Sequence, residues 1–328
     1  MTTLYIDSKR VSALYIDGKK VKLGSAPAEP QYLTFEPLSS AAPDADKTQV
    51  LLRNDDSTSL TGTFEARLND GAWTTVSWGD VSHGIDYNLV KACDAGKETI
   101  SFGEKLQIRG LDKWNSSCSL KVTCAGGAKV SGKMADSLTP EYAASETTYK
   151  LASFFKGSTG LKDASGLDLG DIALADGCYH YMFYGCTSLT QAPVLPAMTL
   201  ARYCYDSMFR YCSKLTQAPA LPATALADGC YHYMFYGCTS LTQAPALPAT
   251  TLAKGCYDGM FYGCSKLTQA PVLPATTLAN KCYTYMFENC TKVTELHYPA
   301  SVQNDSTFTG MTGSPWFGAT NATVHYDL

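Results

Sequence analysis

The amino-acid sequence predicts a mixed fold in which N-terminal β-structure is followed by a solenoid of short α/β units. Three patterns support this class: a nine-residue segment that occurs twice at the start, a run of short β-branched and aromatic segments after it, and a 26-residue repeat in the second half. The 328 residues accordingly divide into a β-hairpin segment at 1–24, a linker at 25–31, a β-sandwich at 32–140 and the solenoid at 141–328.

The N-terminal segment repeats itself with an offset of ten residues. Residues 3–11 have the sequence TLYIDSKRV and residues 13–21 have ALYIDGKKV, with Asp17-Gly18 as a typical tight-turn pair. The pattern predicts consecutive β-hairpins. Because so small an element cannot bury a core, we expect residues 1–23 to attach to the following domain or to other chains. The GSAPAEP that follows is rich in small residues and proline, as in a linker.

The next region has the composition of an antiparallel β domain. About seven short runs rich in β-branched and aromatic residues are separated by Asn-Asp, Asp-Gly and Gly-Gly turns. This number of strands over roughly a hundred residues predicts an immunoglobulin-like sandwich. Cys93, Trp114, Cys118 and Cys124 show no secure Cys–Trp–Cys spacing of the antibody type.

The strongest signal is the 26-residue period, which is typical of a solenoid because a single unit cannot bury its apolar face alone. A full unit, residues 226–251, has the sequence LADGCYHYMFYGCTSLTQAPALPATT. Cys230, Met234 and Cys238 stand at i, i+4 and i+8, which predicts a short helix, and the proline-containing LTQAPALPA predicts a short strand. Stacked units would then form a parallel sheet.

Ten of the 13 cysteines fall in two columns of the repeat, and we interpret them as structural core. Zinc sites commonly use C-x-x-C, whereas the two cysteines of a unit are eight residues apart. Five cysteines per column cannot all pair as disulfides. A hairpin disulfide between Cys118 and Cys124 stays open, and no cofactor or metal is expected. The columns are Cys178, Cys204, Cys230, Cys256 and Cys282, and Cys186, Cys212, Cys238, Cys264 and Cys290.

The unit CYxxMFxxCxxLTxxPxLPATxLA resembles the BspA-like, Bacteroides surface type of leucine-rich repeat. The resemblance covers roughly residues 150–298. It implies a right-handed solenoid with a concave strand face, found in adhesins and recognition proteins of gut Bacteroidales, their phages and some eukaryotic parasites. It implies no catalytic activity. The family's export signal is missing from this sequence.

Charge and hydropathy exclude two classes of partner. With a net charge of −4 and no clustered Lys and Arg, the chain lacks the basic surface that nucleic acids need. No apolar stretch approaches the ~18 residues that span a bilayer, so no membrane insertion is expected. Charge is sparsest after residue 150, which predicts uncharged partners, namely a host-surface glycan or protein.

Two sets of side chains in the repeats are candidates for ligand binding. Tyrosines at variable positions offer rigid, amphipathic contact area, or they shield the convex face. Glutamines at one constant position form a structural ladder, which is compatible with lining a binding surface. His180 and His232 share their position with Asp206, Asp258 and Thr284, as on an exposed face. The candidates are Tyr181, Tyr184, Tyr233, Tyr236, Tyr262, Tyr285, Gln191, Gln217, Gln243 and Gln269.

These observations predict a non-enzymatic structural and recognition protein. The Met start, the missing signal and the docking hairpins favour a phage virion component that binds other virion proteins through residues 1–23. The alternative is a bacterial cell-surface adhesin of the BspA-like class. A glycan-degrading enzyme is a remote alternative, since no carboxylate pair or catalytic motif stands out. The sequence leaves open the ligand and whether the chain forms a homo-oligomer.

Overall fold

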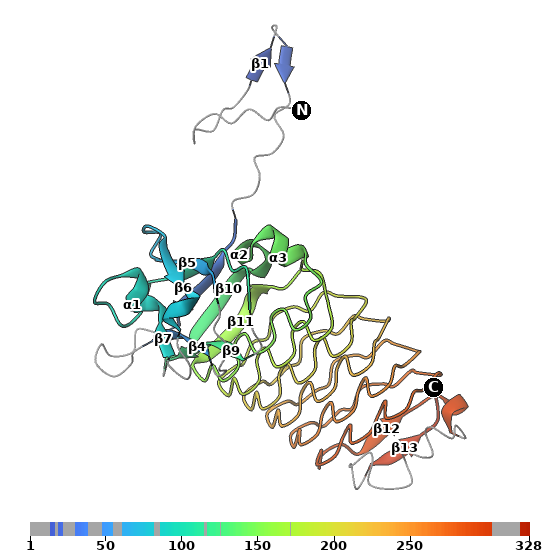
Figure 1. The fold of residues 1–328 in the computed structure, drawn as a ribbon. Helices are drawn as coiled ribbons and strands as arrows, with labels where there is room; N and C mark the ends of the chain where they lie inside the picture. The colour runs from blue at the N-terminus through green and yellow to red at the C-terminus, as the bar shows by residue number, and fades with distance from the viewer. Residues whose placement is uncertain are drawn as a thin grey trace. The chain divides into compact units, whose positions relative to one another are not determined.

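The computed structural model divides the chain into two compact units, residues 1–31 and 32–328 (Figure 1). In the first unit, β1 (Leu14–Ile16) pairs antiparallel with β2 (Lys19–Val21), while the first copy of this pattern lies outside the described residues. The structure describes residues 14–16, 19–21, 30–38, 48–54, 61–81, 86–114, 117–124, 126–170, 172–303 and 322–328.

The second unit begins with two sheets. Short helices flank them, and strands such as Leu33–Pro37 alternate buried and half-buried residues, as half-buried strands do. The six-stranded sheet has the order β11 (Leu161–Asp168), β10 (Ala128–Lys133), β3 (Leu33–Pro37), β8 (Leu106–Arg109), β5 (Thr63–Leu68) and β6 (Thr74–Ser77). The three-stranded sheet has the order β7 (Asp86–Asn88), β4 (Gln49–Asn54) and β9 (Cys118–Thr123). These helices are α1 (Leu89–Cys93), α2 (Met134–Ser137), α3 (Pro140–Ala144) and the 3-10 turn Trp78–Asp80, whereas a second 3-10 turn, Ala300–Val302, follows the repeats.

Strand β11 joins the sheet to the repeats. It pairs in parallel with β10, whereas the other pairings of this sheet are antiparallel. On its other side, Asp163 and Asp168 form single parallel bridges to Gln191 and Val194 of the first full repeat. The sheet therefore serves as the first layer on which the repeats stack, as the run from green to yellow in Figure 1 shows.

The cysteine-containing part of each repeat is not helical, so the predicted helix is wrong. We call these parts the turn segments; they comprise residues 177–186, 203–212, 229–238, 255–264 and 281–290. Every fourth residue has a positive φ, as at Gly229 (61°), Tyr233 (51°) and Gly237 (70°), which no right-handed helix accommodates. The four residues of each turn are close to the 3.6 residues of an α-helical turn. Cys230 and Cys238 therefore still face the core.

Backbone hydrogen bonds in the turn segments alternate between two directions. His232 and Met234 donate their N–H to the carbonyl three residues back, at 3.1 and 3.2 Å. Tyr233 and Phe235 donate instead to the following repeat, to the carbonyls of Asp258 and Met260 at 2.9 Å. Half of the donors thus fasten one repeat to the next, and each turn segment depends on its neighbour for its conformation.

The proline-containing segments do not form the predicted strands, and this expectation is also wrong for the central repeats. They meet only in single parallel bridges, such as Gln217 with Gln243 and Gln243 with Gln269. Proline has no N–H, so Pro245 and Pro248 cannot donate to a ladder. Among the described residues, a regular strand follows the repeats only at β12 (Glu295–His297), which pairs in parallel with β13 (Thr323–His325).

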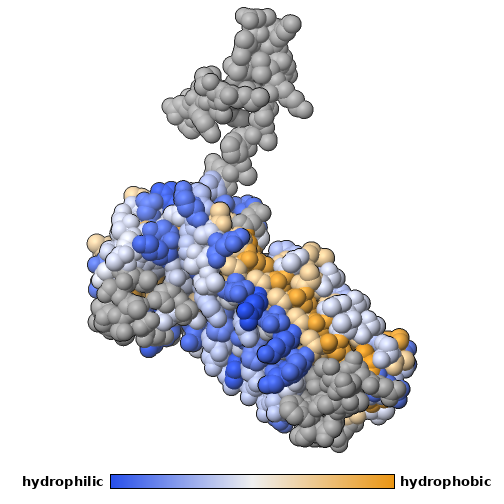
Figure 2. All heavy atoms as spheres, turned by 45° about the vertical axis from the view of Figure 1, so that its right-hand side comes forward, coloured by the Kyte–Doolittle hydropathy of each residue, from blue (hydrophilic) through white to orange (hydrophobic). Residues whose placement is uncertain are grey.

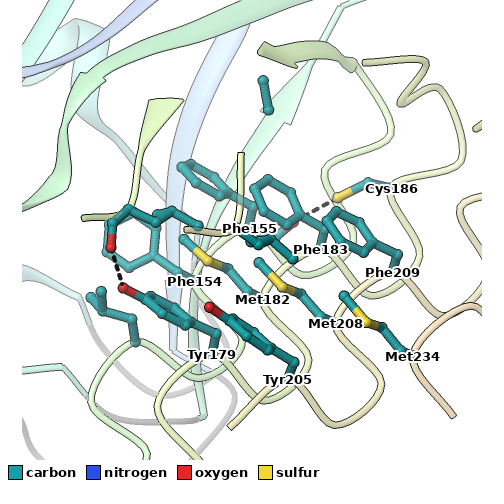
Figure 3. Packing of buried hydrophobic residues seen from close by; sticks show 14 of the residues in the cluster. Phe154, Phe155, Tyr179, Met182, Phe183, Cys186, Tyr205, Met208, Phe209 and Met234 are labelled. Carbon is teal, nitrogen blue, oxygen red and sulfur yellow. Dashed lines mark hydrogen bonds between the residues drawn. The ribbon is translucent and has the colours of Figure 1, made fainter. Parts of the chain in front are cut away.

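Columns of identical side chains fill the interior of the stack (Figure 3). The rings of Phe183, Phe209 and Phe235 lie 5.4 and 5.7 Å apart and within 8° of parallel. Tyr179 and Tyr205 stack in the same way at 5.7 Å in a second column, so the constant tyrosines pack between units. Because like residues recur in register, each aromatic ring packs on its own equivalent.

All 13 cysteines are thiols rather than disulfides, Cys118 and Cys124 included. The ten repeat cysteines are at most 1% exposed. In the second column each Sγ–H donates to the carbonyl of a phenylalanine in the preceding layer, for example Cys186 to Phe155 at 3.1 Å and Cys238 to Phe209 at 3.1 Å. Burial raises the pKa of Cys186 to about 12, so the thiol keeps its proton and this contact.

Candidate recognition surface

Half-buried and exposed tyrosines form a continuous chain of ring contacts along the turn segments. Tyr181 contacts Tyr184 at 5.1 Å between ring centroids, and Tyr184 contacts Tyr211 at 5.5 Å. Tyr211 contacts Tyr236 at 5.3 Å, and Tyr236 stacks on Tyr262 at 4.5 Å. Edge-to-face and stacked pairs of this kind hold their rings rigid, so the chain offers preorganised aromatic area across four repeats.

Arg210 lies in the middle of this chain. Its guanidinium carbon is 4.2 Å from the ring centroid of Tyr236, 5.1 Å from that of Tyr211 and 5.2 Å from that of Tyr233. A hydrogen bond from Arg210 to the Tyr211 hydroxyl, at 3.4 Å, lowers the pKa of Tyr211. Arg210 Nε is enclosed and has no hydrogen-bond partner among the described residues. We call the set Tyr181, Tyr184, Arg210, Tyr211, Tyr233, Tyr236 and Tyr262 the tyrosine face.

The structure brings five of the six candidate tyrosines together on this face. Tyr285 occupies the same position of the unit as Tyr181 and Tyr233 and is 37% exposed. The sequence analysis missed Arg210 and Tyr211, although both depart from the repeat. Arg210 stands where three of the other four units have tyrosine, and Tyr211 stands where the same three have glycine.

The four candidate glutamines form an exposed column on a different part of the unit. Gln243 Nε2 donates to Gln269 Oε1 at 3.3 Å, which is the in-register amide contact of a ladder. Beside it, the Thr268 hydroxyl donates to the carbonyl of Thr242 at 3.2 Å. The column therefore links repeats and leaves its amides accessible at the surface.

Exposed apolar side chains occur on the proline-containing segments. Val194, Met198 and Val272 are 68%, 55% and 55% exposed, and Figure 2 shows hydrophobic surface along the stack. A hollow lined by Met198, Leu169 and Tyr205 among others holds about 230 Å³. This volume is below the roughly 300–1,000 Å³ of small-molecule sites, so an extended surface fits these repeats better than a pocket does.

The histidine–aspartate column is more buried than expected, and its interpretation as an exposed face is wrong. Asp206 is 8% exposed and Thr284 is 2% exposed. Asp206 lies between two histidines, 3.4 Å from His180 Nε2 and 3.2 Å from His232 Nδ1. Burial alone would raise the pKa of Asp206, but hydrogen bonds from both histidines bring it to about 2.

Asp258, in the same column, has the opposite character. Its Oδ1 has no hydrogen-bond partner among the described residues, and burial raises its pKa to about 6. An acid whose pKa is raised on folding keeps a proton that the unfolded chain releases, so stability falls as pH rises from about 4 to 6.

We expect Asp258→Asn to increase the free energy of unfolding at pH 8 by about 1–2 kcal/mol after allowance for its partial exposure, and to change it little below pH 4. Asp206→Asn is the matched control. The pKa of the Asp206 carboxyl is lowered on folding, which stabilises the wild-type fold at pH 8. Asp206→Asn should therefore lose stability at that pH. Urea unfolding at the two pH values measures both effects. Stabilisation by both variants at pH 8 would contradict the assignment.

No helix in the described part of the chain is both long and apolar enough to cross a membrane. Residues 231–312 match the family model of the BspA-type leucine-rich repeat region, in six copies. Neither a curated protein nor a solved structure matches the chain. Repeats of this type are typically non-enzymatic binding modules and are consistent with a surface or recognition protein. Residues 231–312 are therefore similar to the BspA-type leucine-rich repeat region.

Proposed function

We propose that this protein is a non-enzymatic recognition protein that binds a host-surface glycan across its tyrosine face. The observation that carries the proposal is the contact chain of five tyrosines with the Arg210 guanidinium over three rings. Aromatic rings pack against the apolar faces of sugars, while tyrosine hydroxyls and a guanidinium bond to sugar hydroxyls.

The repeat also favours an extended ligand over a compact one. The tyrosine face spans successive layers of the stack, so a chain of sugars would meet similar weak contacts one after another. Linked contacts of this kind add up to useful affinity through effective concentration. The low charge of the repeats suits an uncharged polysaccharide, and a host protein surface is the alternative ligand.

The proposed setting is a phage virion, with a bacterial cell surface as the alternative. In this proposal the repeats form a solenoid carried by an immunoglobulin-like sandwich, and residues 1–23 attach the protein to other virion or surface proteins. The antiparallel pairing of β1 with β2 supports a small β-element that gains partners by association.

The proposal is tested by measuring binding of the full chain to an array of host capsular and surface glycans. We expect Tyr236→Ala and Arg210→Gln each to weaken binding at least about tenfold, because both lie at the centre of the face. Tyr203→Ala is the matched control, since Tyr203 is a 37% exposed tyrosine of the repeats outside the ring-contact chain, and its loss should leave binding unchanged.

Two results would contradict the proposal. One is absence of glycan binding by the wild-type protein, or equal binding by all variants. The other is release of reducing ends from a bound glycan, which would identify a glycan-degrading enzyme instead. Circular dichroism of each variant confirms that a loss of binding is not a loss of fold.

A further inference from the structure

The C-terminal end of the described structure brings together two histidines and two carboxylates, separately from the tyrosine face. Parallel pairing of β12 with β13 places His297 beside His325, and their rings stack at 4.7 Å between centroids. Glu295 lies two residues before His297 on the same strand. Alternate residues of a strand point to one face, so Glu295 and His297 share the face on which His325 lies.

The ligand atoms of these three residues are close enough for one ion. One atom each from Glu295, His297 and His325 lies within 4.8 Å of the other two. Around a tetrahedral zinc ion the ligand atoms would be about 3.3 Å apart, as follows from bonds of about 2.0–2.1 Å. The Glu295 and His297 side chains are 66% and 37% exposed. Small rotamer changes can therefore bring the ligand atoms from within 4.8 Å of one another to the spacing that zinc requires.

Asp327 orients His297 for this role. Its two carboxylate oxygens lie 2.9 and 3.1 Å from His297 Nδ1. The other ring nitrogen, Nε2, faces Glu295 Oε2 at 3.9 Å. A carboxylate on one nitrogen of a histidine whose other nitrogen binds metal is the usual arrangement at metal sites, because it fixes the tautomer and raises the basicity of the ligand.

His325 supplies the observation that an ion pair alone does not explain. Its Nε2 is shielded from solvent and has no hydrogen-bond partner among the described residues. A shielded polar atom without a partner costs free energy. An ion pair of His297 with the two carboxylates leaves that nitrogen unsatisfied, whereas a cation in the cluster gives it a ligand bond.

We propose that Glu295, His297 and His325 bind one divalent transition-metal ion of the Zn²⁺ type, with Asp327 holding His297 in place. Two imidazoles and one carboxylate suit Zn²⁺, Co²⁺ or Ni²⁺, whereas Mg²⁺ and Ca²⁺ prefer oxygen ligands alone. Because the ligands come from both β12 and β13, the ion fastens residues 323–325 to the end of the repeat stack.

The experiment is calorimetric titration of the metal-free full chain with ZnCl₂. We expect one ion per chain, and we expect His325→Gln and Glu295→Gln each to weaken binding at least about tenfold. Glu295→Gln tests the site without threatening the fold, because this side chain is 66% exposed. His180→Gln is the matched control from the histidine–aspartate column and should bind like the wild type.

Co²⁺ gives a second readout that does not depend on stability. Co²⁺ absorbs visible light when it is bound to nitrogen and oxygen ligands. This absorption should appear with the wild-type protein and with His180→Gln but not with His325→Gln. Absence of zinc binding up to about 1 mM would overturn the proposal. Equal affinity in wild type and both site variants, or loss of binding only in His180→Gln, would do so as well.

Discussion

Replacing Gly259 with alanine is expected to destabilise the protein by about 2–5 kcal/mol. Two costs combine at this position. Gly259 has a φ of 59°, which disfavours any residue with a Cβ. In addition, a Cβ built there lies 1.9 Å from Cε1 of Tyr233 in the preceding repeat. The ring of Tyr233 occupies the space that the side chain would need, and urea unfolding measures the loss.

Gly263→Ala is the matched control for this prediction. Gly263 has a similar φ of 72°, but the nearest atom to its Cβ is Gly237 Cα at 3.8 Å. Gly263→Ala should therefore lower the free energy of unfolding only by the backbone cost of about 1–2 kcal/mol. The double variant Tyr233→Ala/Gly259→Ala should recover the steric part of the loss. Equal destabilisation by Gly259→Ala and Gly263→Ala would show that the ring contact is not responsible.

The same pairing occurs elsewhere in the stack. A Cβ at Gly229 would lie 2.2 Å from the ring of Tyr203, and one at Gly237 would lie 2.6 Å from the ring of Tyr211. A tyrosine with positive φ in one repeat thus lies across a glycine in the next. At these junctions the glycine leaves the space between two layers to the tyrosine ring of the preceding repeat.

Phe235→Ala is the second variant with a large expected effect, a loss of about 3–5 kcal/mol. The Phe235 ring is fully buried and stacks between Phe209 and Phe261, at 5.7 Å from each and within 5° of parallel. Alanine leaves a cavity that the neighbouring layers cannot close, because hydrogen bonds to both adjacent repeats fix their spacing.

Phe235→Leu controls for the size of this cavity and should lose substantially less. Thermal and urea unfolding of the two variants checks the prediction. Because repeat proteins can unfold in parts, the comparison uses the midpoint of the main transition monitored by two probes. A loss below about 1 kcal/mol for Phe235→Ala would contradict the view that the ring column carries the stability of the stack.

The repeat could be predicted from sequence, but the conformation of its turn segments could not. A fixed period and buried positions at i, i+4 and i+8 are properties of side-chain placement, and Cys230, Met234 and Cys238 are indeed buried. A four-residue turn period produces the same pattern as a helix. The distinguishing signal is that most of these fourth positions hold glycine or tyrosine, whose positive φ only the structure reveals. The immunoglobulin-like topology of residues 32–140 stays a prediction.

The two candidate sites differed in how far the sequence could predict them. Most tyrosines of the tyrosine face recur at fixed positions of the unit and could be predicted from the repeat, whereas Arg210 stands at a position where it departs from the repeat. The cluster around His297 and His325 depends on the pairing of β12 with β13, which lie in a region that drifts off the period. Contacts between segments 28 residues apart leave no local pattern to detect.

The alternating direction of the backbone hydrogen bonds has an evolutionary consequence. Each turn segment donates to the segment that follows it and accepts from the one before, in the same way at every junction of the central repeats. A unit copied or deleted as a whole leaves every remaining junction with its usual bonds. Gene duplication can therefore lengthen or shorten the stack in steps of one repeat, and selection on the reach of the protein can act without a redesign of its core.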